Sequence, residues 1–412
     1  MSVDSQARRE TLGRRQRNRL LGLHPLDLLA LILLIAGALC VATGALSRTE
    51  TSSILDRILP LLLFLGTVII LAELTGRAQT FDVVATRLAI TARGRYSVLF
   101  ALCVLMAVVT TVGLNLDTTA VLLTPIMLAM ATRIGMPLLP LAMTTALLAN
   151  TASLLLPVGN LTNLLAANRV ALSPVDFAAR MAAPEAASVA VTMAVLWVGY
   201  WRKSRRGGAD RYELPEPFRP QDRVLCAVAG VACVLFVVAI LLGVTLGVAS
   251  AVAAAVTVLA FAMRERAALR WSLLPWRLLA TVTGMFLVVQ TITVHGLGTL
   301  ITHLAGGSNS FVGQLRAAGT GTLLANLLNN LPAYVASESA VPVTNHSQLL
   351  ALLIGTNAGP VITAWASLAT LLWYERCAAF GLEIPKRRTL LNGAVLAVLA
   401  VSAATAALAL TG

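Results

Sequence analysis

Charged residues are scarce in this chain. Asp, Glu, Lys and Arg together make up 12% of its 412 residues, whereas an ordinary soluble domain carries about 25%. Apolar residues make up 58% of the chain, and its mean hydropathy is +0.83. This composition excludes an ordinary soluble domain and predicts a polytopic membrane protein built entirely of helices.

Further absences narrow the function. The five cysteines form no CxxC pair, so we expect small buried hydrophobic side chains and no metal or redox site. The chain has no HExxH motif, no DDxxD run and no recognisable Ser-His-Asp set, and it therefore reads as a protein that is not an enzyme and has no cofactor. It also lacks a Walker A motif, so ATP drive would require a separate soluble ATPase subunit, whose existence the sequence leaves open.

Apolar runs long enough to cross a bilayer recur along the chain, since a spanning helix needs about 20 such residues. About nine spans are predicted, at 26–46, 54–74, 138–165, 185–201, 222–242, 246–263, 277–296, 347–374 and 390–410. Two more segments, 96–132 and 308–341, are apolar with a polar break in the middle. We expect re-entrant helical hairpins there, with ordinary helix pairs as the alternative. No cleavable signal peptide is expected, because the first apolar run follows a polar arm.

Basic residues mark one side of the membrane. Most of the 31 lysines and arginines lie in the arm 1–25 and in segments 77–95, 202–221, 264–277 and 376–388. Segments 243–245, 297–307 and 342–346 contain none and are expected as outer loops. The positive-inside rule then predicts a cytoplasmic N-terminus and an outer C-terminus in a plasma (inner) membrane of bacterial type. The net charge of +13 is therefore explained by basic loops on the cytoplasmic side of the membrane. Because the charge needs no other explanation, we expect no nucleic-acid partner. Segment 77–95 reads as an amphipathic helix on the cytoplasmic surface.

The chain contains an internal repeat. Residues 26–201 and 222–412 follow the same plan on either side of a Gly- and Pro-rich linker at 202–221, and the second half carries an extra leading span. An offset of 207 aligns Asn150 with Asn357 and Asn160 with Ser367. The basic residues predict that the first hairpin opens to the cytoplasm and the second to the outside. Such inverted repeats are typical of secondary transporters with a site at the membrane midplane.

Polar residues interrupt both halves in the middle of apolar runs. Asp117 stands at membrane depth, where acids are costly and usually functional. Pro157 with Gly159, and Gly359 with Pro360, break helices and free backbone groups for binding. The candidate substrate site comprises Asn115, Asp117, Thr118, Thr119, Gly159, Asn160, Thr162, Asn163, Asn329, Asn330, Asn357, Gly359, Thr363 and Ser367. The competing interpretation is that these residues join helices or cap the hairpins without binding a solute.

Four motif regions carry a family resemblance. The letters LDTTAVLLTPI at 116–126, ANTASLLLPVGNLTNL at 149–164, NNLP at 329–332, and GTNAGPVIT at 355–363 with SLATLLW at 367–373 resemble the arsenite permease (ArsB) family of the ion-transporter superfamily. That superfamily also holds sodium-coupled carboxylate transporters. The resemblance implies scaffold and transport subdomains, a site between the hairpin tips and the unwound helices, and a homodimer by analogy. Arsenite permeases usually have one more span at the amino terminus.

The residue types favour a neutral cargo. Trivalent arsenic and antimony are mainly neutral hydroxides near neutral pH, and amide, hydroxyl and backbone groups suit them. The apolar stretches contain no Lys or Arg that would pair with a carboxylate, and Asp117 would repel one. We therefore predict a transporter that exports arsenite or antimonite in exchange for protons by alternating access, with Asp117 as the proton-coupling residue. The alternatives are a sodium-coupled uptake carrier for a small carboxylate-type anion and a cation/proton antiporter.

Three other groups receive minor roles. Cys226 and Cys233 share a helix face, but they lie far in sequence from the motifs, so arsenic ligation by them is the weaker idea. His295 and His303 are expected near the outer interface. Glu73 is expected as a snorkelling residue at the cytoplasmic end of its span.

Overall fold

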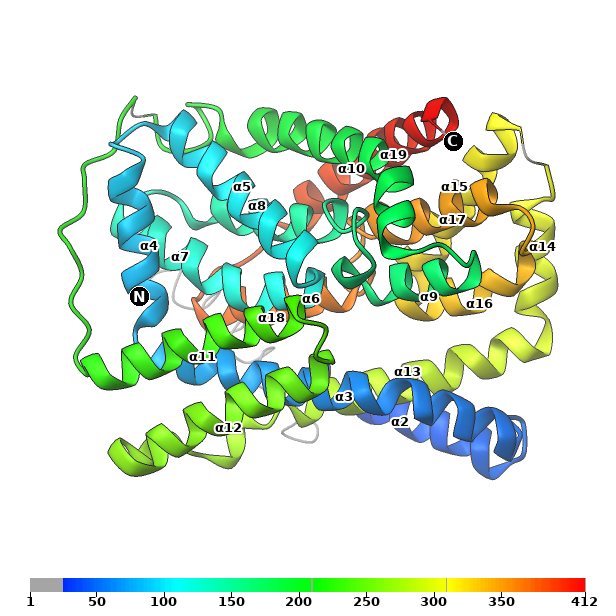
Figure 1. Ribbon diagram of the computed structural model, residues 1–412, viewed down its shortest axis with the longest axis horizontal. Coiled ribbons are helices and arrows are strands. Elements are labelled where there is room, and N and C mark those ends of the chain that lie inside the picture. Colours follow the sequence, from blue (N-terminus) through cyan, green and yellow to red (C-terminus); the bar gives the residue numbers. More distant parts are fainter. Residues whose placement is uncertain (1–24, 209, 309, 412) are drawn as a thin grey trace, which may run out of the picture.

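The computed structural model describes residues 25–208, 210–308 and 310–411 (Figure 1). The predicted basic arm therefore lies outside the described residues except for Pro25, which begins a helix. Within the described residues all regular structure is helical, apart from one isolated antiparallel bridge between Arg95 and Arg211. The predicted all-helical fold class is confirmed.

The first half contains two long helices, a surface helix, a hairpin, a broken helix and a final long helix. In order these are α2 (Pro25–Ala42), α3 (Arg48–Arg77), α4 (Thr80–Thr91), the hairpin of α5 (Tyr96–Gly113) with α6 (Leu116–Thr118), η1 (Thr119–Leu123) and α7 (Thr124–Arg133), the broken helix of α8 (Leu138–Thr151), η2 (Pro157–Gly159) and α9 (Leu161–Arg169), and α10 (Pro174–Leu196) continuing into η3 (Trp197–Trp201).

The second half repeats this order behind one additional helix. It runs through α11 (Arg223–Leu241), α12 (Leu246–Arg264), η4 (Arg266–Ala268), η5 (Trp271–Leu273), α13 (Trp276–Ile292), η6 (Thr293–Leu297), α14 (Gly298–Ala305), the hairpin of α15 (Phe311–Leu328) with α16 (Asn330–Ser337), η7 (Glu338–Ala340), the broken helix of α17 (His346–Ala358) and α18 (Leu368–Ala379), and α19 (Lys386–Thr411).

Helix α14 corrects the sequence prediction, which treated residues 297–307 as an outer loop. It precedes the second hairpin as α4 precedes the first. Its own segment is too short to be recognised as a span, but the internal repeat offered a signal, because the first half already predicted a surface helix at the matching place.

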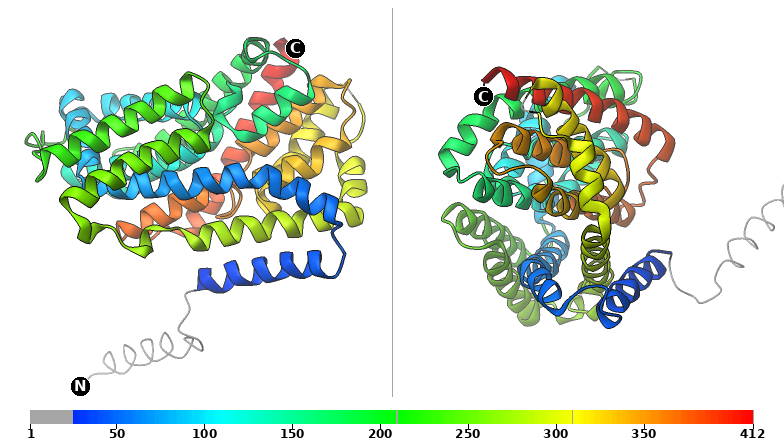
Figure 2. Two further views of the ribbon diagram at one scale, coloured as in Figure 1. Left: turned by 60° about the horizontal axis from the view of Figure 1, so that its bottom comes forward. Right: turned by 90° about the vertical axis from the view of Figure 1, so that its right-hand side faces the viewer.

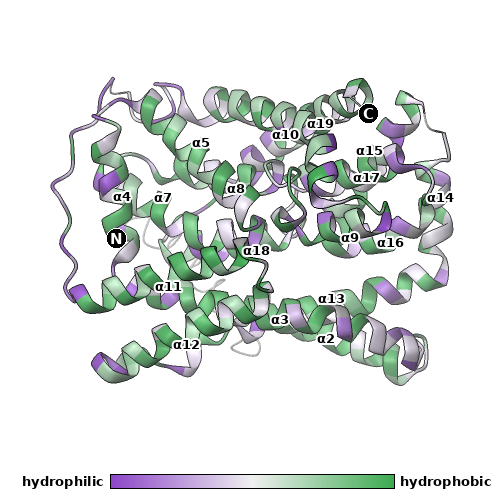
Figure 3. Cartoon of the chain, viewed as in Figure 1, coloured by the Kyte–Doolittle hydropathy of each residue, from purple (hydrophilic) through white to green (hydrophobic). Residues whose placement is uncertain are grey.

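Helix lengths and surfaces are those of a membrane protein. Seven helices among the described residues are long and apolar enough to cross a bilayer, and α8 and residues 30–42 of α2 are shorter apolar helices. Of the predicted spans, 138–165 and 347–374 are each two helices joined by non-helical backbone. The outward faces of α11 and α12 expose large apolar side chains such as Val234, Leu235 and Leu259, and Figure 3 shows these helices as mostly hydrophobic. The chain is a polytopic membrane protein.

The helices form two layers, and in each layer helices of the first half pack on helices of the second half. Helices α2, α3, α12 and α13, with α11 packed on α12, lie below the rest of the bundle in the view of Figure 1, and the end-on view of Figure 2 shows the same separation. Within this layer α2 packs on α13 and α3 packs on α12, while α10 packs on α19 in the other layer. Each of these pairs joins one half of the chain to the other. If α2 corresponds to α12 and α3 to α13, the first two contacts are one contact repeated, which supports an internal two-fold relation.

The linker between the halves is held against the first half. The Tyr212 hydroxyl donates to the Ala89 carbonyl oxygen at 2.6 Å, and the guanidinium of Arg133 lies 3.9 Å from the ring centre of Phe218. At its end, Asp222 caps α11 and accepts from Arg264 Nε at 2.8 Å. This hydrogen bond to Arg264 holds the pKa of the Asp222 carboxyl below its usual value. The described residues of the segment predicted as a linker therefore lie along one end of the molecule (Figure 1).

The α2–α13 contact generates a stability prediction. Gly284 leaves no room for a side chain, because a Cβ there would overlap the backbone of Leu33 and Leu34. We expect Gly284→Ala to destabilise the protein by about 1–3 kcal/mol through overpacking. The control is Gly319→Ala in α15, where a Cβ would meet nothing within 4 Å. Thermal unfolding in detergent checks both variants, and equal melting temperatures for them would contradict the described packing.

Candidate functional site

The tip of the first hairpin is built from its own capping residues. The Asn115 side chain accepts from the Thr118 amide at 2.7 Å, and the Thr119 hydroxyl donates to the Asn115 carbonyl oxygen at 2.9 Å. The Thr111 hydroxyl donates to that of Thr119 at 3.1 Å. These bonds start the helix in which Asp117 occupies the first turn. The family resemblance implies that Asp117 and Thr118 form this tip, and both lie in the short helix that follows α5. Their part in substrate binding, like that of Asn115 and Thr119, stays a prediction.

Asp117 is buried without a partner. Its residue is 9% exposed, and its Oδ1 atom is buried with no hydrogen bond to any of the described residues. The turn that follows it, η1, is a π-helical turn, a feature that is frequent at functional sites. An acceptor with unused capacity inside an apolar protein is unusual and costly. Asp117 is therefore available to bind a solute or a proton.

The tip of the second hairpin is bonded to the broken helix beside it. Asn329 has φ +90, and its side-chain amide donates to the Trp365 carbonyl oxygen at 2.9 Å. The backbone amide of Asn330 donates to the Ala366 carbonyl oxygen at 2.8 Å. One turn earlier, the Asn326 side chain donates to the Gly359 carbonyl oxygen at 2.9 Å and accepts from the amide of Thr363 at 3.1 Å. The second hairpin and residues 359–367 thus form one hydrogen-bonded unit.

Asn326 is a site-supporting residue that sequence reasoning missed. It lies three residues before Asn329 in the same polar stretch, but it was not among the predicted site residues. Its role depends on Ile362 and Thr363, 36 and 37 positions later in the chain, because its side-chain oxygen accepts hydrogen bonds from their backbone amides. The sequence signal that could have identified Asn326 is its amide side chain, one turn before the hairpin tip. In the membrane interior such a side chain needs hydrogen-bond partners within the protein.

The first broken helix is supported by Asn163. Its side-chain nitrogen donates to the carbonyl oxygens of Ser153 and Leu156, at 2.6 and 2.8 Å. Gly159 lies close to the first hairpin, since a Cβ at this residue would stand 3.3 Å from the Thr111 carbonyl oxygen. Asn160 directly precedes α9, and its side chain accepts from the Thr162 amide at 3.2 Å. The predicted break at Pro157–Gly159 is confirmed.

The second broken helix restarts at an equivalent position. Ser367 is the N-cap of α18, and its hydroxyl accepts from the Thr370 amide at 3.0 Å. The repeat offset paired Ser367 with Asn160, and both residues stand at the start of a restarted helix. Gly359 and Thr363 lie in the non-helical segment before it.

The two broken helices are joined across the repeat. Asn357 donates to the Asn163 side-chain oxygen at 2.6 Å and accepts from the Thr162 hydroxyl at 2.7 Å. In the reciprocal contact, Asn150 donates to the Thr370 hydroxyl at 3.4 Å. The sequence offset pairs Asn150 with Asn357 and Thr370 with Asn163. The same contact therefore occurs twice, once short and once long, as expected for two related halves.

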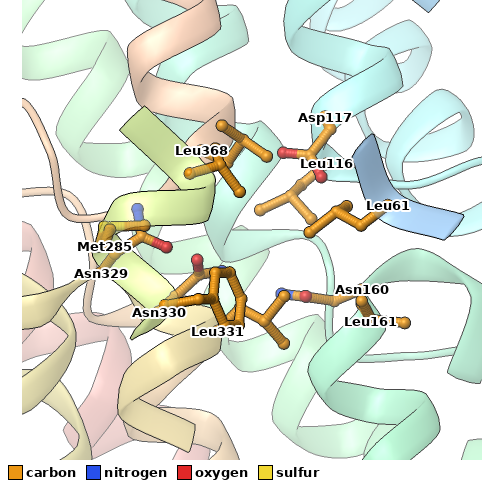
Figure 4. Close-up of a pocket in the computed structure, with 12 residues that line it drawn as sticks. Leu61, Leu116, Asp117, Asn160, Leu161, Met285, Asn329, Asn330, Leu331 and Leu368 are labelled. Atoms are coloured by element: carbon orange, nitrogen blue, oxygen red, sulfur yellow. The ribbon is translucent and has the colours of Figure 1, made fainter. Parts of the chain in front are cut away.

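A small cavity lies between the two hairpin tips (Figure 4). Its polar lining comes from Asp117, Asn160, Asn329 and Asn330, which belong to both hairpins and to the first broken helix. Its apolar lining consists of Leu61, Leu116, Leu161, Val282, Met285, Phe286, Leu331 and Leu368. The space is ≈ 20 Å³, which is about the room that one water molecule needs. Four predicted site residues thus meet around one small cavity that contains no Lys or Arg in its lining.

The remaining candidates lie around this cavity rather than in its lining. Asn115, Thr118 and Thr119 build the first tip, and Thr162, Asn163 and Asn357 join the broken helices. Their assignment to substrate binding stays a prediction. The apolar wall from α3 and α13, including Leu61 and Phe286, was not predicted, because nothing distinguishes these residues from others in apolar spans.

Cys226, Cys233, His295 and His303 do not line the cavity. Glu73, predicted to be a snorkelling residue, lies near the C-terminal end of α3 and is partly exposed. It forms an ion pair with Arg376 at 3.1 Å, which joins α3 to α18, and a second one with Arg77 at 3.7 Å.

Comparison with known families decides the class of the protein. The sequence profile of the CitMHS family, described as citrate transporter, matches residues 21–370. The chain belongs to the CitMHS family. Its family is one of membrane transporters, in agreement with the prediction that the chain is not an enzyme.

Individual relatives agree with this membership. The arsenical pump membrane proteins of Escherichia coli and Yersinia enterocolitica are each 29% identical to this CitMHS-family chain over 330 residues, which cover 74% of the chain and 76% of the relative. The protein of that name from Escherichia coli strain K12 is 28% identical over the same share. The resemblance to arsenite permeases within the ion-transporter superfamily is confirmed.

The cross-repeat contact generates a second stability prediction. We expect Asn357→Ala to destabilise the folded protein by about 1–3 kcal/mol, because it leaves buried polar groups of Thr162 and Asn163 without partners. The matched variant is Asn150→Ala, which removes the longer reciprocal bond, and we expect it to cost less. Thermal unfolding in one detergent ranks the two. A larger loss for Asn150→Ala would contradict the described network.

Proposed function

We propose that the protein exports arsenite or antimonite in exchange for protons. The observation that carries this proposal is the cavity between the hairpin tips, whose polar lining is one carboxyl and three amides without a basic residue. The relatives are arsenical pump membrane proteins, and this name favours the same cargo. They come from bacteria, so we place the protein in the plasma (inner) membrane.

The polar lining suits a neutral trihydroxide. Trivalent arsenic and antimony near neutral pH carry hydroxyl groups that donate and accept hydrogen bonds but have no net charge. The side-chain amides of Asn160, Asn329 and Asn330 contain both hydrogen-bond donors and hydrogen-bond acceptors. The unused Oδ1 atom of Asp117 can accept a hydrogen bond from a hydroxyl group of the solute. A neutral solute also tolerates the apolar wall of Leu61 and Phe286, whereas an ion would have to lose its hydration there.

Exchange follows from competition at Asp117. An ionised Asp117 accepts hydrogen bonds from the arsenic hydroxyls, and a protonated Asp117 loses much of that capacity. Proton binding from the outside therefore favours release of the solute, and proton release to the cytoplasm restores the binding form. One carboxyl that carries either a solute or a proton gives obligatory exchange, provided that it faces one side at a time.

Alternating access is supported by the paired architecture. Two hairpins and two broken helices surround one cavity, and related halves of this kind are typical of secondary transporters. The cavity is too small for a trihydroxide in the described conformation, so the proposal requires it to widen on one side and then on the other.

The orientation in the membrane rests on charge. Helix α4, the segment 202–222 and the C-terminal end of α12 lie together at one end of the molecule, and α14 lies at the other end (Figure 1). The first group carries many of the basic residues, so the positive-inside rule puts it in the cytoplasm and the C-terminus outside.

A second candidate function is uptake of a carboxylate-type anion coupled to sodium. The description of the family as citrate transporters favours it. The cavity argues against it, because Asp117 would repel the anion and no Lys or Arg in the lining would pair with it. Flux into proteoliposomes separates the two: the export proposal requires arsenite movement that depends on protons and not on sodium.

The proposal predicts the behaviour of Asp117→Asn. The amide keeps the shape of the side chain but cannot exchange a proton, so we expect proton-coupled arsenite export to fall by about 100-fold or more. The amount of inserted protein should stay the same. The control is Glu265→Gln, a neutralised acid at the exposed end of α12, which should leave export unchanged. Arsenite efflux from everted vesicles with an imposed proton gradient measures both, and normal efflux from Asp117→Asn would exclude this role.

A further inference from the structure

A second buried acid lies on the far side of the first broken helix. Glu185 is 5% exposed and stands about three turns inside α10. The sequence prediction began a span at residue 185 and therefore treated this glutamate as a helix end. The true start is marked by Ser173 and Asp176, which cap the helix, and this Ser-x-x-Asp pattern was the signal that would have placed Glu185 in the interior.

Glu185 binds the backbone of the broken helix with one oxygen only. Its Oε2 atom accepts from the Leu154 amide at 2.9 Å, and its Oε1 atom is buried with no partner among the described residues. The same face of α10 holds the end of α8, since the Ser188 hydroxyl donates to the Thr151 carbonyl oxygen at 2.7 Å and the Thr192 hydroxyl donates to that of Thr151 at 2.8 Å. Glu185 is thus the ionisable member of a row that positions the break.

No cation balances this acid within the described part of the chain. None of the described ion pairs involves Glu185. Helix α8 and residues 152–160 contain no charged or titratable residue. The charged or titratable groups on the other elements near α10, and on α10 itself, are the following. They are Tyr200 on η3, Arg169 on α9, Arg316 on α15, Tyr334 on α16, His346 on α17, Lys386, Arg387 and Arg388 in the first turn of α19, and Asp176 and Arg180 on α10. An ionised carboxylate with a single donor is costly in these surroundings.

The peptide that Glu185 holds is connected to the other half of the protein. Leu154 shares its peptide unit with the Ser153 carbonyl group, whose oxygen accepts from the Asn163 side chain at 2.6 Å. Asn163 in turn accepts from Asn357 at 2.6 Å. A change in the bond to the Leu154 amide therefore acts on the peptide that anchors the cross-repeat contact. This chain of bonds joins Glu185 to the segment that ends at Asn160, one of the cavity-lining residues.

We propose that Glu185 is a second proton-exchanging residue of the transport cycle and that it positions the first broken helix. A proton moves between Oε1 and water that enters as the break opens, and no other bond forms or breaks. The ionised carboxylate binds the Leu154 amide strongly, and the neutral acid binds it weakly. Proton occupancy at Glu185 thereby sets how firmly the segment before Asn160 is held. The inference rests on the proposed proton-coupled function, because only a proton-driven cycle gives this exchange a role.

A purely structural cap would not need this residue type. A glutamine would accept from the Leu154 amide with its carbonyl oxygen and would carry no charge into the membrane. The unused Oε1 atom is the position that differs between the two side chains. Glu185→Gln therefore keeps the described hydrogen bond and removes only the exchangeable proton. Glu185→Asp keeps the proton at a shorter reach, and Asp176→Asn neutralises an exposed acid on the same helix as a control.

Infrared spectroscopy of the purified full chain tests proton exchange directly. We expect a carboxylic-acid band that appears and disappears on pH titration, persists in Asp117→Asn and Asp176→Asn, and is lost in Glu185→Gln. If Glu185→Gln cannot be purified, Glu185→Asp must shift the midpoint of the same band. At least one of these two Glu185 variants is measured. If its band titrates in the same way as that of the wild type, the proposal is overturned. This readout does not require transport, so it decides the inference even if the wild type moves no arsenite, which would refute the proposed function instead.

Transport assays then test the role of that proton. In proteoliposomes we expect Glu185→Gln to slow net, proton-driven arsenite movement by about tenfold and to flatten its pH profile, while arsenite–arsenite exchange, which needs no net proton movement, stays near the wild-type rate. Glu185→Asp should restore part of the pH dependence. An unchanged pH profile in Glu185→Gln overturns the proposal. An equal loss of net movement and exchange, with no recovery in Glu185→Asp, also overturns it and assigns Glu185 a structural role.

Discussion

Broken helices inside a membrane must find hydrogen bonds within the protein, because lipid offers none. This constraint governs the centre of the molecule. Asn163 supplies donors for the first break, and Asn326 supplies both a donor and an acceptor for the second. Asn357 then connects the two breaks through Asn163 and Thr162. The positions of the hairpin tips, and hence of the cavity, depend on these side-chain amides.

The same network explains why the cavity is polar although no basic residue lines it. The amides that complete the backbone are neutral, so the cavity acquires polarity without acquiring positive charge. Asp117 adds the single ionisable group of the lining, and α3 and α13 add an apolar wall through Leu61 and Phe286. In the proposed function, this lining binds a solute that forms hydrogen bonds but carries no net charge, and a proton is the exchangeable charge.

Much of this arrangement was predictable because it interrupts a simple pattern. Asp117, Pro157–Gly159 and Gly359–Pro360 break long apolar runs, and each proved to stand at a hairpin tip or in an unwound segment. The internal offset correctly paired Asn150 with Asn357, whose contacts across the repeat correspond. These features are local in sequence, which is why pattern and composition revealed them.

The remaining features depend on contacts between distant segments. Asn326 binds residues about one hairpin arm later in the chain, Glu73 pairs with Arg376 across the two layers, and Glu185 binds a backbone amide of another helix. No local pattern encodes such partners. Phe286 lines the cavity although its surroundings in sequence match those of any apolar span. The small size of the cavity is likewise a property of packing, and the sequence analysis made no prediction about it.

The central claim is that the space between the two hairpin tips holds the transported solute. The most direct test is a density map of the full chain in lipid with antimonite bound, in which the strong anomalous scattering of antimony locates the solute. The account predicts a single antimony peak between Asp117 and the amides of Asn330 and Asn160. A peak at the cysteines of α11, or at any position away from Asp117, would contradict it.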